Sequence, residues 1–213
     1  YPSTVQAMDS LSMLGFALRH KSIAVFDGQS ATLPMTFTEV SASNDSSIIV
    51  TGRLESVAAT GLDLSGTSIF AVRNATVTTS ITVADLTVAS RSLCAFTTIS
   101  MINSPIVFLK VSDADVSHES AVLVADTTFT GVVQLERVNF AGSSTLLVDE
   151  SSFMVDKPSS VPGGIMCWEC VAHSNSTLLL RNLLFKSTTA PGIDFMGSYA
   201  TGTGSAIVLN GVN

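Results

Sequence analysis

Acidic side chains recur along this chain at a spacing that could pair two carboxylates. Asp126 and Glu150 each follow a short run of apolar residues and are separated by two twelve-residue units. In a chain that winds with two such units per coil they would stack one coil apart, at about 4.8 Å, close to the carboxylate separation of a retaining glycosidase. Asp113, Asp115 and Asp149 are further acidic candidates. Because acidic residues at such positions are more often turn residues, we assign no catalytic residue and keep Asp126, Asp149 and Glu150 only as candidates.

Basic residues do not add to this chemistry. A polysaccharide lyase would need a basic proton acceptor, but Lys110, Arg137 and Arg181 are isolated in the sequence and predict no such site. The ten basic residues are scattered and the formal charge is −7. We therefore expect no nucleic-acid partner and no anionic membrane surface, since both require a clustered basic face.

The segment from Cys167 to Cys170, Cys-Trp-Glu-Cys, has the spacing of a redox motif. A thioredoxin-like site needs its first cysteine at a helix N-terminus, whereas the preceding residues predict a strand or loop. A local disulfide between Cys167 and Cys170, or a pair of strand thiols, is the interpretation we prefer. As a zinc site the motif lacks a second pair, with only Cys94 and His173 to help, so we predict no metal and no cofactor.

Two aromatic residues and three sequons could involve sugars. Trp168 and Tyr199 could form a stacking platform for a glycan, although a lone aromatic residue more often packs than binds. Asn44, Asn74 and Asn175 each begin an Asn-X-Ser/Thr triplet. These asparagines are glycosylation candidates if the chain is secreted, and in a sequence so rich in Ser and Thr such triplets also arise by chance.

The composition favours a β-rich globular chain. Hydrophobic residues make up 46% and charged residues 13% of the 213 residues, which argues against disorder and against a coiled coil. Ser and Thr together number 54 and Val 23, which suits half-buried strands joined by small polar turns. No stretch reaches the roughly 18 apolar residues of a membrane span, so we predict no membrane contact within this segment.

A twelve-residue unit repeats through the chain. Serines stand at positions 68, 80, 92 and 104, and after a four-residue slip further units start at 120, 132 and 144. Each unit holds a small residue, three or four apolar β-formers, a polar residue five or six places on, and then a large apolar residue. The polar positions include Arg73, Asn74, Asp85, Lys110, Asp126, Asp149, Arg181, Asn182 and Asn210. The large apolar positions are Val77, Phe129, Phe140, Phe153 and Phe185. We predict that the polar residue turns the chain and that the large residue re-enters the interior.

Two all-β folds fit this repeat. A β-sandwich also has short strands every 8–12 residues. A right-handed parallel β-helix would use two units per coil, about 24 residues. Equivalent positions of successive coils would stack directly, with phenylalanine above phenylalanine and serine above serine. We prefer the β-helix, because a sandwich gives no reason for the same residue class to recur at the same phase.

The ends and the breaks in the repeat suggest the domain organisation. Residues 7–20 have helical spacing and predict a short N-terminal capping helix, with a linker or a degenerate first coil as the alternative. We therefore divide the chain into a cap, residues 1–25, and a solenoid, residues 26–213. Pro and Gly clusters at 157–164 and 188–204 predict loops that bulge from one side. The last residues continue an apolar strand pattern, so we expect a fragment of a longer chain.

Segments such as 143–153, Ser-Ser-Thr-Leu-Leu-Val-Asp-Glu-Ser-Ser-Phe, and 175–185, Asn-Ser-Thr-Leu-Leu-Leu-Arg-Asn-Leu-Leu-Phe, resemble the dispersed gene family of trypanosomatid surface proteins. The resemblance covers residues 44–213 and lies in repeat style rather than in a catalytic signature. It implies a pectin-lyase-like β-helix in a membrane-anchored surface protein that acts in adhesion. It carries over no functional residue.

We therefore expect a non-enzymatic segment of a cell-surface or secreted protein, serving as a stalk or as an adhesive module that presents a ligand-binding surface. Its partner would be a glycan or a host surface protein. A polysaccharide-active β-helix enzyme of the glycoside hydrolase type and a purely structural repeat spacer are the alternatives.

Overall fold

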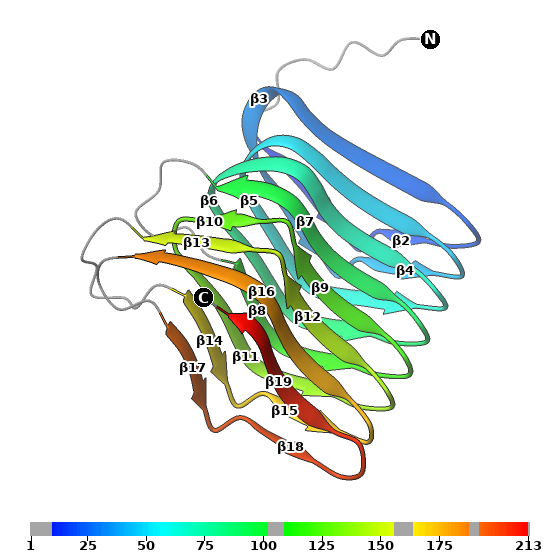
Figure 1. Cartoon of the computed structure of the whole chain (residues 1–213). Helices are drawn as coiled ribbons and strands as arrows, with labels where there is room; N and C mark the ends of the chain where they lie inside the picture. Colours follow the sequence, from blue (N-terminus) through cyan, green and yellow to red (C-terminus); the bar gives the residue numbers. More distant parts are fainter. Residues whose placement is uncertain (1–9, 102–108, 156–163, 188–191, 213) are drawn as a thin grey trace.

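The repeating units form β-strands that stack side by side in parallel (Figure 1). The computed structural model describes residues 10–101, 109–155, 164–187 and 192–212. Within these ranges nineteen strands make one sheet that winds around a common axis, and its strand pairings are parallel. The fold is a parallel β-solenoid. The β-sandwich alternative is wrong, because a sandwich is built from antiparallel strands.

The strands, in chain order, are β1 (Leu11–Leu14), β2 (Ala17–Leu18), β3 (Ile23–Thr38), β4 (Ser41–Ser43), β5 (Ser47–Ser65), β6 (Ile69–Val88), β7 (Leu93–Met101), β8 (Leu109–Val116), β9 (Ala121–Ala125), β10 (Thr128–Phe129), β11 (Val132–Phe140), β12 (Thr145–Asp149), β13 (Ser152–Val155), β14 (Gly164–Trp168), β15 (Val171–His173), β16 (Thr177–Ser187), β17 (Gly192–Met196), β18 (Tyr199–Thr201) and β19 (Ala206–Val212). The described residues contain no helix, and therefore none that could cross a bilayer.

Eight coils can be counted along one column of paired residues. We number them 1 to 8 by the residue at which this strand of the coil begins: Ile23, Ser47, Ile69, Leu93, Ala121, Thr145, Thr177 and Ala206. Hydrogen-bonded serines of successive coils are separated by 24, 22, 24, 28 and 32 residues for coils 1, 2, 3, 4 and 6. The predicted coil of 24 residues is therefore confirmed, and longer coils depart from it by insertion. Its two twelve-residue units are visible in coil 3, where they begin at Ile69 and Ile81.

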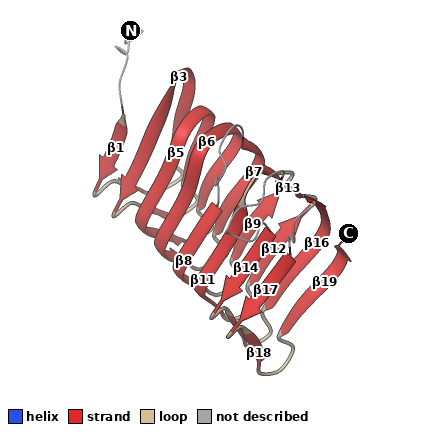
Figure 2. Cartoon of the chain, turned by 90° about the vertical axis from the view of Figure 1, so that its left-hand side faces the viewer, coloured by secondary structure: helices blue, strands red, loops and turns tan. Residues whose placement is uncertain are grey.

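Added residues in the longer coils enter at one point of the cross-section. The length is added between β7 and β8 in coil 4, between β13 and β14 in coil 6, and between β16 and β17 in coil 7. The predicted loop at 157–164 lies almost wholly outside the described residues, as do residues 188–191. The rest of the second predicted loop is mostly strand, because residues 192–201 pair with the preceding coil as β17 and β18. The strands that follow the insertions keep their register with the neighbouring coil. Figure 2 shows β14 and β17 side by side in the stack.

Each coil turns at three corners, where the repeat predicted two. At the corners the backbone has positive φ, a conformation in which Gly, Asn and Asp are favoured. The first corner holds Gly15, Glu39, Gly61, Asp85, Asp113, Arg137, Glu169 and Gly197. The second holds the pairs His20–Lys21, Asn44–Asp45, Gly66–Thr67, Ser90–Arg91, His118–Glu119, Gly142–Ser143 and Ser174–Asn175. The third holds Gly52, Asn74, Thr98, Asp126, Glu150, Asn182 and Gly211.

Four of the nine polar residues of the twelve-residue template turn the chain. Four others, Arg73, Asp149, Arg181 and Asn210, directly precede a third-corner residue, and Lys110 lies inside β8, so for these five the prediction is wrong. Asn74, Asp85, Asp126 and Asn182 have φ values of 48°, 52°, 49° and 52° and occupy the first and third corners. The second corner was missed because its residue types vary from coil to coil. That corner falls between two units rather than inside one, so no position of the template has a constant residue type there.

A ladder of buried serines supports the second corner. The amide of Ser68 donates to Oγ of Ser92 in the next coil, at 3.1 Å, and Oγ of Ser68 donates to the carbonyl of Ser65, at 2.8 Å. The same position is Ser22, Ser46, Ser120, Ser144, Ser176 and Ser205 in the other coils. Each hydroxyl satisfies backbone groups that the turn would otherwise leave unpaired in the interior. Serine above serine was predicted, and this is its physical cause.

One apolar core runs the length of the stack. Inward side chains from every strand column fill it, including Phe70, Phe96 and Leu146. Phe129 lies against Phe153 with ring centroids 5.1 Å apart and nearly parallel planes, and Phe153 lies against Phe185 at 4.8 Å. The predicted stacking of phenylalanine over phenylalanine is confirmed.

The predicted N-terminal helix is wrong for the residues that the structure describes. Residues 10–20 form β1 and β2, which pair in parallel with β3 and β4 of the following coil. Their apolar side chains Leu11, Met13 and Leu18 pack against the core. The alternative of a degenerate initial coil was correct: β1 and β2 form a partial coil before coil 1, because strand pairing with the next coil overrides the helical spacing. Residues 1–9 lie outside the described residues.

Candidate functional site

The register places Asp126 and Glu150 on one column of the third corner. The neighbouring pairs Ala125 with Asp149 and Thr128 with Ser152 fix this alignment. Both carboxylates are exposed, and both residues have left-handed backbone, with φ of 49° and 46°. Neither is among the residues that line the groove described below.

Asp149 is paired with an arginine of the next coil. Nε of Arg181 donates to Oδ1 of Asp149 at 3.0 Å, and Nη2 donates to Oδ2. Nδ2 of Asn182 donates to Oδ1 at 3.1 Å. These hydrogen bonds from Arg181, together with its positive charge and the Asn182 amide, lower the pKa of Asp149. A buried carboxylate fixed in this way stabilises the stack and is a poor general acid at neutral pH.

A second charged network covers the outward side of β8 and β11 and their first corner. Arg137 donates from Nε and Nη2 to both oxygens of Asp113, at 2.6 and 2.9 Å, and also pairs with Glu136. Lys110 Nζ lies 2.9 Å from Glu136 Oε2. These partners lower the pKa of Asp113, chiefly through the Arg137 hydrogen bond, and the pKa of Glu136, chiefly through Lys110.

These basic residues are isolated in the sequence but paired in the fold. Lys110, Arg137 and Arg181 each contact a carboxylate in an adjacent coil. The sequence does contain the signal, since Asp113 and Arg137 are 24 residues apart. Opposite charges one coil apart predict an ion pair once the coil length is known.

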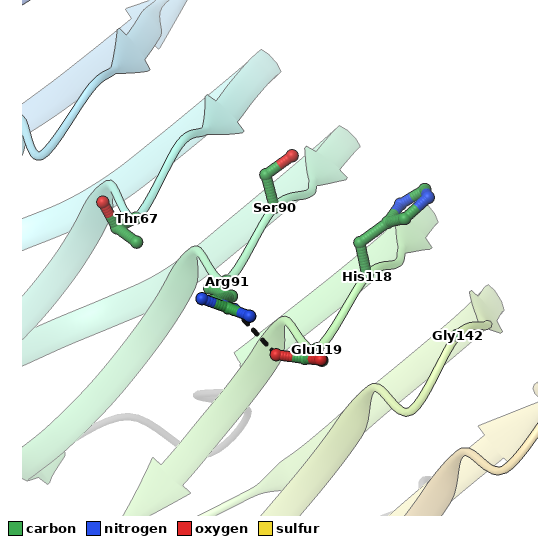
Figure 3. A pocket seen from close by; sticks show the side chains of 6 residues that line it. All are labelled: Thr67, Ser90, Arg91, His118, Glu119 and Gly142. Atoms are coloured by element: carbon green, nitrogen blue, oxygen red, sulfur yellow. Dashed lines mark hydrogen bonds and ion pairs between the residues drawn. The ribbon is translucent and has the colours of Figure 1, made fainter.

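A shallow groove of about 420 Å³ lies along the second corner (Figure 3). Its lining comes from four successive turns: Thr67, Ser90, Arg91, His118, Glu119 and Gly142. Arg91 Nε lies 2.7 Å from Glu119 Oε2, with side chains 69% and 59% exposed. His118 projects outward, with Nδ1 3.0 Å from the hydroxyl of Ser117. Exposed cationic, anionic and imidazole groups in one hollow can bind a polar ligand through hydrogen bonds. Sequence reasoning missed the groove because its residues come from separate coils.

The cysteines are buried thiols. Cys94, Cys167 and Cys170 are free, and the predicted disulfide between Cys167 and Cys170 is not formed in the structure. The two thiols lie on either side of the first corner and share a hydrogen bond. This contact and burial raise the pKa of Cys167, whereas the same hydrogen bond lowers the pKa of Cys170. No group of three or more His, Cys, Asp and Glu side chains among the described residues could hold a metal ion.

Trp168 and Tyr199 lie on opposite sides of the first corner. Trp168 ends β14 and is half-buried, and its indole Nε1 is buried without a hydrogen-bond partner among the described groups. Tyr199 begins β18 in the following coil and is 54% exposed. No stacking between these rings is found in the described part of the chain. A glycan platform that uses both rings stays a prediction.

The three sequon asparagines all occupy corners. Asn44, Asn74 and Asn175 are exposed and have φ values of 54°, 48° and 68°. Asparagine tolerates this left-handed conformation better than most residues. The fold alone therefore accounts for these asparagines, and glycosylation stays a prediction.

No protein-family model matches this chain, and no curated protein matches its sequence. The class that the strand pairing defines is the parallel β-solenoid.

Proposed function

We propose that this chain is a non-enzymatic segment of a cell-surface protein, acting as a β-solenoid stalk and ligand-presenting module. The observation that supports the proposal is the uninterrupted stack: eight coils share one core and continuous strand columns, and insertions do not disturb them. The surface location rests on the resemblance in repeat style and on the Ser- and Thr-rich composition.

The stack is suited to holding a surface at a distance. Seven intervals of about 4.8 Å give a rise of about 34 Å along the axis. Each coil contacts only its neighbours, so stiffness comes from the cumulative strand pairing and core. Corners can vary in residue type without breaking the strands, which lets a constant scaffold carry a variable surface.

The groove along the second corner is the described surface that best fits a ligand. It offers Arg91, His118 and Glu119 from turns that a rigid stack holds in register. These groups fit the hydroxyl and carboxylate groups of a glycan, or the polar side chains of a host surface protein. The ion pair between Arg91 and Glu119 is exposed enough to exchange partners at small cost.

A binding array of glycans and host surface proteins tests the ligand-presenting role. We expect binding that Arg91→Ala and His118→Ala reduce, while Arg53→Ala, an exposed arginine outside the groove, leaves it unchanged. An array with no bound ligand would favour the purely structural spacer. Protease treatment of intact cells that express the protein tests its location, and full protection there would contradict a surface role.

A polysaccharide-active enzyme is the alternative, and the stacking of Asp126 and Glu150 favours it. Release of reducing ends from a panel of acidic glycans separates the two functions. We expect no release by the wild-type chain. Release that disappears in Asp126→Asn and Glu150→Gln, and persists in Asp115→Asn, would establish hydrolysis instead.

A further inference from the structure

Outward side chains on one face of the solenoid are unusually apolar. This face lies between the second and third corners, on the strands that begin the eight coils. The first outer column is Val25, Ile49, Ala71, Ala95, Leu123, Leu147, Leu179 and Val208. The second outer column is Ile23, Ser47, Ile69, Leu93, Ala121, Thr145, Thr177 and Ala206.

These residues are not part of the core. Along β12, Leu146 and Val148 are fully buried and belong to the core cluster, whereas Leu147 between them is half-buried and does not. At the N-terminal end of the columns Ile23 and Val25 are 67% and 58% exposed. A soluble sheet normally places polar residues on its outward face. An outward face that is apolar in all eight coils of its first column, and in all but Ser47, Thr145 and Thr177 of its second, marks an interaction surface.

We propose that this face binds a second copy of the same chain, in a two-fold dimer whose solenoid axes run antiparallel. A two-fold axis parallel to the strands passes between coils 4 and 5. It places two coils opposite each other when their numbers add up to nine, so that the order of the coils is reversed in the second copy. Coil 4 then faces coil 5 and coil 3 faces coil 6, with each outer column facing its own copy. Packing of two sheets with nearly aligned strands, about 10 Å apart, is a common arrangement.

Side-chain volumes are complementary under this symmetry. In the first outer column Ala71 faces Leu147 of the other copy, and Ala95 faces Leu123. Ala71 and Ala95 are consecutive in this column and have its shortest side chains, so they lie below the level of the flanking Ile49 and Leu123, opposite the two leucines of the other copy. In the second outer column Leu93 faces Ala121.

Alternative registers are less favourable. Sliding the copies by one coil would face Arg73 with Arg181 on the next outward column, or Ala95 with itself. Parallel solenoid axes would also place Ala95 on Ala95. In the two-fold arrangement Arg73 lies opposite Asp149, which is buried and already paired with Arg181 of its own chain, so no like charges face each other. The side-chain volumes thus select the register, and the charges do not oppose it.

The area is sufficient for a specific dimer. Eight coils at about 4.8 Å and a five-residue strand of about 17 Å cover roughly 650 Å² per copy, or about 1,300 Å² in total. This lies at the lower end of the range of about 1,200–2,000 Å² for stable interfaces. An isologous contact of this kind closes on itself and forms no fibre.

Sedimentation velocity over a concentration series tests the proposal on the 213-residue chain. We expect a monomer–dimer equilibrium, and we expect Leu147→Glu to weaken it by at least about tenfold because it places a charge in the interface. Thr82→Glu, at an outward half-buried position on another face, is the matched control and should leave dimerisation unchanged. A chain that stays monomeric up to about 100 µM, or a dimer unaffected by Leu147→Glu, would overturn the proposal.

A double-mutant cycle tests the register. Ala71→Leu and Leu147→Ala should each weaken the dimer, and the double variant should recover most of the loss because the large and small residues exchange places. Within one copy these sites are three coils apart, about 14 Å, so coupling in dimerisation can only arise across the interface. Thermal unfolding of dilute protein controls for folding. Additive losses in the cycle would contradict the proposed arrangement.

Discussion

Leu146 and Leu147 are neighbours in one strand, yet the solenoid uses them in opposite ways. Leu146 points inward and is fully buried in the shared core. Leu147 points outward onto the apolar face and is half-buried. A similar contrast holds along the stack for Val122 with Leu123 and for Leu178 with Leu179. A run of consecutive apolar residues therefore holds an inward set that builds the core and an outward set that the proposed dimer would bury.

The largest expected effect separates the two leucines directly. Leu146→Asp places an unpaired charge in the core and should cost more than about 4 kcal/mol, which abolishes or nearly abolishes folding. Leu147→Asp, studied by urea denaturation at a concentration where the chain is monomeric, should retain the parental free energy of unfolding within about 1 kcal/mol. Equal losses for the two variants would contradict the division between inward and outward columns.

Loss of a stacked ring should come next. Phe153 lies between Phe129 and Phe185, so Phe153→Ala opens a cavity in the core and should destabilise the fold by about 3–5 kcal/mol. Leu184 directly precedes Phe185 in β16 but is 38% exposed. Leu184→Ala is therefore the control and should cost less than about 1 kcal/mol. Chemical denaturation measures both. A small effect at Phe153 would show that the rings do not form one column.

Serine replacement sharpens the comparison at smaller energies. Ser92→Ala removes the hydroxyl that accepts from the buried amide of Ser68, so it should cost about 1–3 kcal/mol. Ser80 begins the second twelve-residue unit of coil 3, as Ser68 begins the first, and it is only half-buried. Ser80→Ala should change the unfolding free energy by less than about 0.5 kcal/mol. Similar losses would mean that the two halves of the coil are equivalent after all.

The smallest expected effect is on the loss of stability at acidic pH. Arg181 lowers the pKa of Asp149 in the folded state, so this group contributes stability above the unfolded value, about 3.9, that is lost as pH falls through the folded value. Asp149→Asn should therefore flatten the acid limb of stability against pH. Thermal unfolding between pH 2 and 6 in roughly half-unit steps would measure this.

Much of the fold could be predicted from the sequence because each coil of a solenoid repeats the same pattern of residue types. The twelve-residue units, their pairing into coils and the polar corners at Asn74 and Asp85 follow directly from spacing. The second corner was missed because it lies between units. The helical spacing of residues 7–20 misled because pairing with the next coil outweighs local propensity in β1 and β2.

The candidate site was harder to predict because its residues meet only across coils. The pairs Asp149 with Arg181 and Arg91 with Glu119 are 32 and 28 residues apart. These separations exceed the usual coil because length is added in coils 6 and 4. Knowing the coil length is therefore not enough, since the positions of the insertions must be known before charges can be matched.

Cross-linking between successive coils tests the central claim, the direct stacking of equivalent positions, most directly. Thr87 and Asp115 are exposed Cα partners in adjacent coils although they are distant in the sequence. Thr87→Cys with Asp115→Cys should form a disulfide on mild oxidation, because strands about 4.8 Å apart are within bonding reach. Thr87→Cys with Asn139→Cys, two coils apart at about 9.6 Å, should not. The native cysteines are buried and serve as an internal reference for thiol counting. A disulfide in the second variant and none in the first would contradict the stack.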